Sequence, residues 1–499
     1  MTFSKVKEDV LAIPNYRDRV MGCWLGKAVG GTLGMPYEGH TGPLKLTYYD
    51  PVPETMLAND DLDLQVLWAC LLDERGERPN VCPELFIKGW RDHINFPWDE
   101  YGVCKRNLEN DILPPLTGAY DNWFANGMGA AIRSEIWACL APGNPALAAA
   151  YAREDACLDH AGDGLWAEVW LASLQSAAFV ESDINKVISI GLEYIPEGAQ
   201  LRQAIQDTQL WWDQCHDWKK IRAKVLAKYG HENFTNVTEN LAFIYLALLD
   251  GAGDFSRSIC TAANCGKDTD CTAATVGALL GIMNPQCIDE KWLRPIGRNL
   301  VLSKEITGIQ PPDTLGGFTD LILSLNKRLD GKWPKRATPH TIDRDLEIRA
   351  YVGSKDVDWF SHGWQTGKPY LLDLPPMTPV NFDGTFARFD ISQVHENAIF
   401  VQYRFRLEQR MRTRVMFNSP HPCLVFLNNQ FCFGREEGRM APSPHRVPMH
   451  QSVDMHLDKG EHTLHAVLNK PDSTKFVEWV VGLSNCDDND LWLSFPWIK

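Results

Sequence analysis

Long apolar runs and clusters of basic residues are both missing from this sequence of 499 residues. No stretch approaches the roughly 18 consecutive apolar residues that a membrane-spanning helix needs, and the N-terminal segment lacks the apolar core of a signal peptide. Lysine and arginine number 49 against 64 aspartates and glutamates, a formal net charge of −15, and they are not grouped as phosphate contacts require. We therefore expect a cytoplasmic protein whose partners include neither nucleic acid nor a membrane.

Paired cysteine motifs are also missing. The 14 cysteines contain no CxxC pair and no regular framework, which is typical of reduced thiols in a core. A zinc site built from Cys260, Cys265 and Cys271 lacks a fourth ligand at a standard spacing. Tryptophan, in contrast, is abundant with 18 residues, and its rings offer large stacking surfaces of the kind that enzymes present to sugars and bases.

Apolar residues recur with helical spacing in the first two thirds of the chain. The clearest segments, two of them rich in the small residues that let helices approach closely, are 62–72, 146–156, 240–249 and 273–283. No run of alternating apolar and polar residues, as expected for a strand, stands out among these segments. We predict an all-α domain over residues 1–335.

The pattern changes near residue 332, where the sequence becomes polar and proline-bearing. Beyond this point the apolar period becomes two, and turn residues separate short runs at 387–391, 399–405, 463–468 and 476–481. Short alternating strands at such spacing favour a β-sandwich. We predict a linker over 336–350 and a sandwich domain of the jelly-roll or carbohydrate-binding kind over 351–499.

Two acidic clusters each precede a predicted helix. Asn59-Asp60-Asp61 comes before one apolar helical run, and Asp268 and Asp270 come before another. Aspartates at a helix start commonly cap free N–H groups, so either cluster alone has a structural explanation. Carboxylates at i and i+2 also converge on one cation, however, and the repeated arrangement indicates a site for a hard dication with oxygen ligands.

Glycines at 22, 26, 30 and 34 recur every four residues and would line one face of a helix. Such a face permits close backbone packing. A phosphate-binding loop is the weaker interpretation, because no strand precedes the glycines and no GK[ST] ending follows them. Glu38, in the turn after this helix, is then placed to point into a site.

Five ordered motifs resemble those of the ADP-ribosylglycohydrolase family. They are GKAVGGTLGMPYEG at 26–39, NDDLDLQVLWACLL at 59–72, NGMGAAIR at 126–133, His160, and GDFSRSICTAANCGKDTDCTAATVGALLG at 253–281. The resemblance runs from about residue 15 to 330. It implies an all-α orthogonal helix bundle with a binuclear Mg²⁺ centre, sometimes Mn²⁺, at the base of a cleft, and hydrolysis of glycosidic bonds to ADP-ribose.

The resemblance also implies roles for individual residues. The family's early cleft glutamate corresponds to Glu38, and its two metal motifs correspond to Asn59-Asp60-Asp61 and Asp268-Thr269-Asp270-Cys271. We accordingly assign catalytic roles to Glu38, Asp60 and Asp61. The predicted cofactor is Mg²⁺, with Mn²⁺ and Ca²⁺ as alternatives and one or two ions, and the predicted metal ligands are Asn59, Asp60, Asp61, Asp268, Asp270 and Cys271.

Three positions depart from the family pattern. Leu62 replaces a threonine and offers no ligand, Cys271 replaces a hard hydroxyl with a soft sulfur, and Gly31 stands where the family usually has aspartate. These changes bring the occupancy of one of the two metal positions into question.

Candidate substrate contacts lie between the metal motifs. Asp99 and Glu100 belong to a segment dense in aromatic and acidic residues, which we predict to be loop-rich and either an ordinary surface loop or a cleft wall. Asn126, Gly127 and Gly129 match a family loop near the substrate. His160 matches a family histidine, with a structural histidine as the competing interpretation.

The sequence thus predicts a metal-dependent glycosyl hydrolase that cleaves an N- or O-glycosidic bond to a ribose-like or other sugar by a Mg²⁺-positioned water. The C-terminal extension favours a saccharide or nucleoside-type glycoside over ADP-ribosylated protein as the substrate, and the sequence alone does not decide between them. The alternative from a different class is a non-catalytic sugar-binding protein with a degraded metal site, supported by Leu62 and Cys271. The oligomeric state and the role of the β domain stay open.

Overall fold

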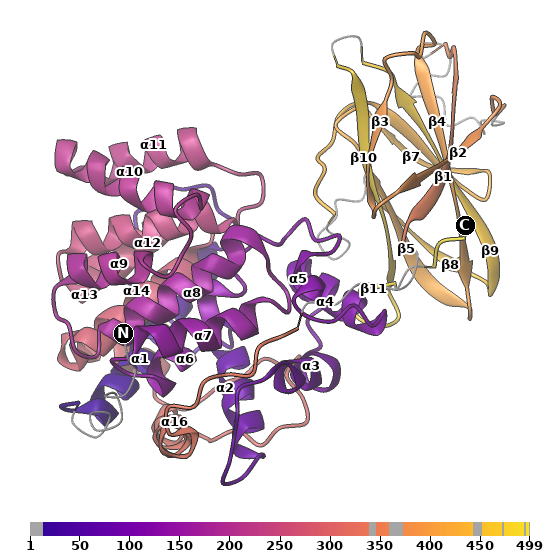
Figure 1. Ribbon diagram of the computed structural model, residues 1–499. Coiled ribbons are helices and arrows are strands. Elements are labelled where there is room, and N and C mark those ends of the chain that lie inside the picture. Colours follow the sequence, from indigo (N-terminus) through magenta and orange to yellow (C-terminus); the bar gives the residue numbers. More distant parts are fainter. Residues whose placement is uncertain are drawn as a thin grey trace. The chain divides into compact units, whose positions relative to one another are not determined.

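The chain divides into two compact units, each described here by itself (Figure 1). The computed structural model describes residues 13–338, 346–358, 373–442, 452–471, 474–493 and 496–498. The first unit comprises Met1–Asn95, Pro114–Ala119 and Phe124–Pro339, and the second comprises Phe96–Leu113, Tyr120–Trp123 and His340–Lys499. The limits 1–335, 336–350 and 351–499 stay predictions, and residues 339–345 of the predicted linker lie outside the described residues.

The first unit is built from helices, as the apolar spacing predicted. Its longer helices are α1 (Tyr16–Gly34), α2 (Asp60–Asp73), α3 (Pro83–Asp92), α7 (Pro145–Ala156), α8 (Gly162–Ala177), α9 (Ile184–Leu192), α10 (Gln200–Cys215), α11 (Trp218–Tyr229), α12 (Val237–Gly251), α13 (Phe255–Asn264), α14 (Thr269–Met283) and α16 (Leu315–Leu329). Short helices are η2 (Met35–Tyr37), α5 (Leu116–Ala119), η3 (Ala131–Arg133), α6 (Glu135–Leu140), η4 (Pro285–Cys287) and α15 (Glu290–Ile296). The all-α prediction for this part of the chain is confirmed.

Helices α1 and α14 pack side by side (Figure 1). A Cβ atom added at Gly26 would lie 2.0 Å from the carbonyl oxygen of Gly277, and one added at Gly277 would lie 2.2 Å from that of Gly26. The same holds at Gly22 against Gly281 and at Gly30 against Ala273. The glycine repeat therefore serves helix packing, as predicted, because only a hydrogen fits at these crossings.

The second unit contains two antiparallel sheets. One has the strand order β2-β1-β4-β9-β6-β7 and the other β11-β10-β5-β8, with β3 also paired to β10. The strands are β1 (Ile348–Lys355), β2 (Thr378–Phe382), β3 (Phe386–Asp390), β4 (Ala398–Leu407), β5 (Met411–Asn418), β6 (Cys423–Leu427), β7 (Gln430–Arg435), β8 (Ser452–Leu457), β9 (Gly460–Asn469), β10 (Phe476–Asn485) and β11 (Leu491–Trp492). Each predicted alternating run lies within one of these strands, or within a residue of its end, which confirms the β-sandwich.

Apolar side chains from both sheets form one core between them. Tyr403 of β4 and Trp479 of β10 are fully buried there, and the indole nitrogen of Trp479 donates a hydrogen bond of 2.8 Å to the Tyr403 hydroxyl. This bond satisfies the two polar atoms that the large rings carry into the core.

The prediction of a loop-rich segment around Asp99 is wrong for residues 99–109. These residues form helix α4 (Asp99–Glu109) of the second unit. The helix begins without a side-chain cap at Trp98, and Asp99 has a positive φ of 47°. The sequence therefore offers acidic residues for the first turn, Asp99 and Glu100, but no capping side chain at the helix start. Among the described residues, no helix has the length and apolar character needed to cross a membrane.

The α1–α14 packing gives a direct prediction. We expect Gly26→Ala to lower the free energy of unfolding by about 1–3 kcal/mol or more, because the added methyl group collides with backbone and not with a movable side chain. Chemical denaturation of the full chain measures this change. Gly198→Ala is the control, since an added Cβ there meets nothing within 4 Å, and equal stability of the two variants would contradict the account.

Candidate metal centre

Three helix ends meet at the predicted acidic site. The Thr269 hydroxyl at the start of α14 donates a 2.7 Å hydrogen bond to the Gly34 carbonyl at the end of α1. The segment before α2 is tied to α1 because the Leu57 amide donates to the Thr32 hydroxyl at 3.3 Å. The close packing of α1 and α14 thus determines where the two acidic clusters lie.

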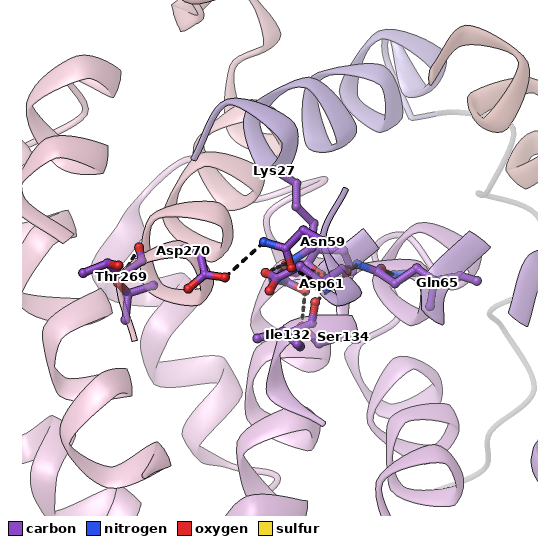
Figure 2. A network of polar contacts seen from close by, with 12 residues as sticks. Lys27, Asn59, Asp61, Gln65, Ile132, Ser134, Thr269 and Asp270 are labelled. Atoms are coloured by element: carbon purple, nitrogen blue, oxygen red, sulfur yellow. Dashed lines mark hydrogen bonds and ion pairs between the residues drawn. The ribbon is translucent and has the colours of Figure 1, made fainter. Parts of the chain in front are cut away.

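Asn59 joins the two clusters (Figure 2). Its side-chain oxygen accepts the backbone N–H of Asp61 at 2.9 Å and so caps α2, while its side-chain nitrogen donates to Asp270 Oδ2 at 3.2 Å. Asn59 therefore positions Asp270 in this arrangement, and its predicted role as an oxygen ligand is disfavoured. Gly31 lies against it, since a Cβ at Gly31 would be 3.2 Å from the Asn59 side-chain nitrogen.

Asp61, Asp270 and Cys271 form the core of the site. One ligand atom of each lies within 4.8 Å of the others, and all three side chains are buried, with Asp61 1%, Asp270 4% and Cys271 7% exposed. Two ligands bonded to one ion at about 2.0–2.6 Å lie at most about 5 Å apart, so this spacing suits a shared cation.

The second carboxylate oxygen of each aspartate supports a cation site. Lys27 binds Asp61 Oδ2 and Asn59 binds Asp270 Oδ2, whereas Asp61 Oδ1 and Asp270 Oδ1 are buried without a hydrogen-bond partner within the described part of the chain. Buried acceptors without partners cost free energy. A dication between them would remove that cost, so the two carboxylates fit a divalent cation.

Lys27 is a functional residue that the sequence analysis missed. Its ammonium is fully buried and lies 3.1 Å from Asp61 Oδ2 and 3.2 Å from Glu135 Oε1 (Figure 2). Gln65 and Gln175 also donate to the Glu135 carboxylate, at 2.9 and 3.2 Å. Lys27 is the one charged residue of an otherwise apolar helical stretch from Cys23 to Leu33, and that isolation was the available signal.

The remaining carboxyl groups concentrate negative charge around this core. Burial, the neighbouring carboxylates of Asp61 and Asp268, and Glu38 raise the pKa of Asp60, and burial and Glu38 raise the pKa of Asp268 and of Asp270. Burial and the four surrounding aspartates raise the pKa of the Cys271 thiol in the same way. Ionisation of several of these groups at once is therefore unfavourable without a cation. A bound dication would offset their negative charge and favour the ionised forms.

Exposure separates two of the three predicted catalytic residues, Glu38 and Asp60, from the buried core that contains Asp61. Glu38 follows η2 and is exposed, and Asp60 is partly exposed. Asp268 is buried and its backbone N–H donates to Asn240 Oδ1 at 3.3 Å. Glu38 and Asp60 are thus the acidic side chains of the site that solvent reaches.

The loop that was predicted to contact the substrate, which includes Asn126, is held by hydrogen bonds to the starts of two helices. The Asn126 carbonyl accepts the Val237 amide of α12 at 2.9 Å, and Asn126 Oδ1 accepts the Gly164 amide of α8 at 3.2 Å. Asn126 is exposed, whereas Gly127 and Gly129 are buried. The substrate role of this loop stays a prediction.

His160 is fully buried, and the structure gives it structural partners. Its Nδ1 lies 2.9 Å from Asp159 Oδ1, and its Nε2 accepts the Ala130 amide at 3.4 Å. Burial opposes ionisation of Asp159, but Arg133 and His160 hold its pKa at about 2. This environment favours the structural interpretation of His160.

Asp99 and Glu100 lie in the second unit, in the first turn of α4, and both are buried. Their assignment as substrate contacts stays a prediction. Leu62 is buried in α2 and contributes no ligand, as expected.

The chain thus has a helical unit with a buried acidic cluster and a second unit with a β-sandwich. Residues 12–330 match the model of the ADP-ribosylglycohydrolase family. The chain belongs to this family, whose members are hydrolases, and the resemblance of its five motifs is confirmed.

Similar solved structures each cover part of this chain. A structure titled "ADP-ribosylglycohydrolase-related protein complex" is 21% identical, covers 63% of this chain and 99% of that chain, and has a TM-score of 0.43. A beta-glucosidase from Kluyveromyces marxianus in complex with glucose is 12% identical and covers 29% of this chain and 16% of that one, with a TM-score of 0.19. No curated protein sequence matches the chain.

The role of the buried Lys27 ammonium can be tested by substitution. Lys27→Met leaves the carboxylates of Asp61 and Glu135 buried without their ammonium partner, so we expect a loss of about 3–5 kcal/mol in the free energy of unfolding. Lys88→Met is the control, because its ion pair with Glu74 is exposed and should contribute about 1 kcal/mol or less. Denaturant titration measures the free energy of unfolding of both variants. A Lys27→Met protein as stable as Lys88→Met would refute the role of Lys27.

Proposed function

We propose that the protein is a metal-dependent glycosyl hydrolase that cleaves an N- or O-glycosidic bond to a ribose-like or other sugar. The observation that carries the proposal is the pair of buried, unpartnered oxygens, Asp61 Oδ1 and Asp270 Oδ1, beside Cys271 in the described structure. Membership of a family of glycohydrolases supports the same conclusion. The proposed cofactor is Mg²⁺, or Mn²⁺ or Ca²⁺, and the substrate is a small-molecule glycoside in the cytoplasm.

Hydrolysis forms a bond from a water oxygen to the anomeric carbon and breaks the bond from that carbon to the leaving oxygen or nitrogen, which takes up a proton. A dication supplies charge that binds sugar hydroxyls and lowers the pKa of a bound water. Asp61 and Asp270 would hold the ion, while Lys27 and Asn59 hold the Oδ2 oxygens of these two carboxylates. Glu38, or the partly exposed Asp60, accepts the proton of the water.

The number of ions follows from the positions at which this chain differs from the family pattern. Leu62 offers no ligand and Asn59 uses its oxygen to cap α2, so the first metal motif provides only Asp60 and Asp61. Gly31 adds no carboxylate where the family usually has one. The proposal therefore requires one ion, held by Asp61 and Asp270.

A saccharide is the second candidate substrate class. The observation that favours it is the β-sandwich unit, an arrangement that simple hydrolysis of ADP-ribosyl groups does not require. Incubation of the purified chain with ADP-ribosylated compounds, furanosides and pyranosides, with Mg²⁺ and with a chelator, separates the two classes. Product formation that needs the metal supports the proposal, and absence of Mg²⁺ binding together with sugar binding alone would favour the non-catalytic alternative.

Substitution of the acidic ligands tests the chemistry. We expect Asp270→Asn to lower kcat by about 100-fold or more, because a metal contributes several kcal/mol of transition-state stabilisation. The circular dichroism and unfolding midpoint should stay near those of the wild type, since asparagine keeps the size of the side chain. Asp289→Asn, at the cap of α15, serves as the control, and an Asp270→Asn enzyme with wild-type kcat would exclude the proposed site.

A further inference from the structure

We propose that the Cys271 sulfur is itself a metal ligand, and that the centre therefore selects a borderline dication such as Zn²⁺ over Mg²⁺. This inference rests on the proposed function in one respect, since both need a dication at Asp61 and Asp270. It changes the identity of the ion and adds a thiolate to its ligands.

The position of the sulfur carries the inference. Cys271 Sγ and one oxygen each of Asp61 and Asp270 lie within 4.8 Å of one another, and the cysteine is buried on the first turn of α14 next to Asp270. Neither Asp61 Oδ1 nor Asp270 Oδ1 has a hydrogen-bond partner in the part of the chain that is described. An ion that binds both oxygens is therefore placed beside the sulfur.

The hard hydroxyl groups nearby are already engaged. Thr272 donates its hydroxyl proton to the Thr269 carbonyl at 3.2 Å, and Thr269 donates its own to the Gly34 carbonyl at 2.7 Å. Both threonines are fully buried. Both hydroxyl protons are thus directed at backbone carbonyls, and Cys271 Sγ is the atom grouped with one oxygen each of Asp61 and Asp270.

The chemistry of this donor set differs from that of an all-oxygen site. Thiolate ligands favour zinc and other borderline or soft ions, whereas Mg²⁺ needs oxygen ligands in near-octahedral geometry. One thiolate and two carboxylates occupy three positions of a tetrahedral zinc site and leave the fourth for water, the arrangement of catalytic zinc. On binding, the sulfur–metal bond replaces the S–H bond and the proton passes to solvent.

Cobalt provides a readout that does not depend on activity. We expect titration of the metal-free full chain with Co²⁺ to produce the near-ultraviolet charge-transfer band of a thiolate–cobalt bond. Cys271→Ser should lack the band and should bind Zn²⁺ at least 10-fold more weakly, the lower limit for loss of even an outer-sphere partner, while its Mg²⁺ affinity stays equal or rises. Cys260→Ser is the matched control, because Cys260 is 8% exposed and lies outside the cluster.

The outcomes separate this inference from the proposed function. The band in the wild type and in Cys260→Ser, but not in Cys271→Ser, supports the thiolate ligand. Stoichiometric Co²⁺ binding without the band, or equal Zn²⁺ affinity in wild type and Cys271→Ser, overturns the inference and leaves the proposed hydrolase intact. Failure of calorimetry to detect any dication at millimolar concentration overturns both.

Discussion

The close approach of α1 and α14 is the constraint on which the centre depends. Glycines on both helices let the backbones touch at Gly26 and Gly277, and the same contact continues to Gly34, where a Cβ would lie 2.4 Å from the Asp270 nitrogen. The end of α1 is thereby held against the start of α14. Because Asp270 and Cys271 belong to that first turn, a helix-packing requirement determines the position of these two proposed metal ligands.

The charge balance of the centre is the second constraint. Asp61 and Asp270 each have one oxygen held by the protein, by Lys27 and by Asn59, and one buried oxygen without a hydrogen-bond partner among the described residues. The buried ammonium of Lys27 offsets part of the negative charge and leaves room for one external dication. These contacts with Lys27 and Asn59 orient the carboxylates before an ion binds. Ion binding then costs less free energy, because the ligands are already in place.

Patterns that are local in the chain were predictable, and contacts between distant residues were not. The four-residue glycine spacing predicted close packing, and aspartates before apolar helical runs predicted both acidic helix starts. The role of Lys27 depends on Glu135, which is 108 residues away, and the orientation of Asn59 depends on Asp270, which is 211 residues away. Helix α4 was missed because its first residue has a positive φ and no side chain caps it.

Anomalous diffraction tests the central claim most directly. Crystals of the full chain grown with Zn²⁺ would be measured at the zinc absorption edge, where a bound ion gives a peak that protein atoms do not. The account predicts one peak at bonding distance, about 2.0–2.3 Å, from Asp61 Oδ1, Asp270 Oδ1 and Cys271 Sγ. A strongest peak elsewhere in the chain, with these three atoms without an ion, would contradict it.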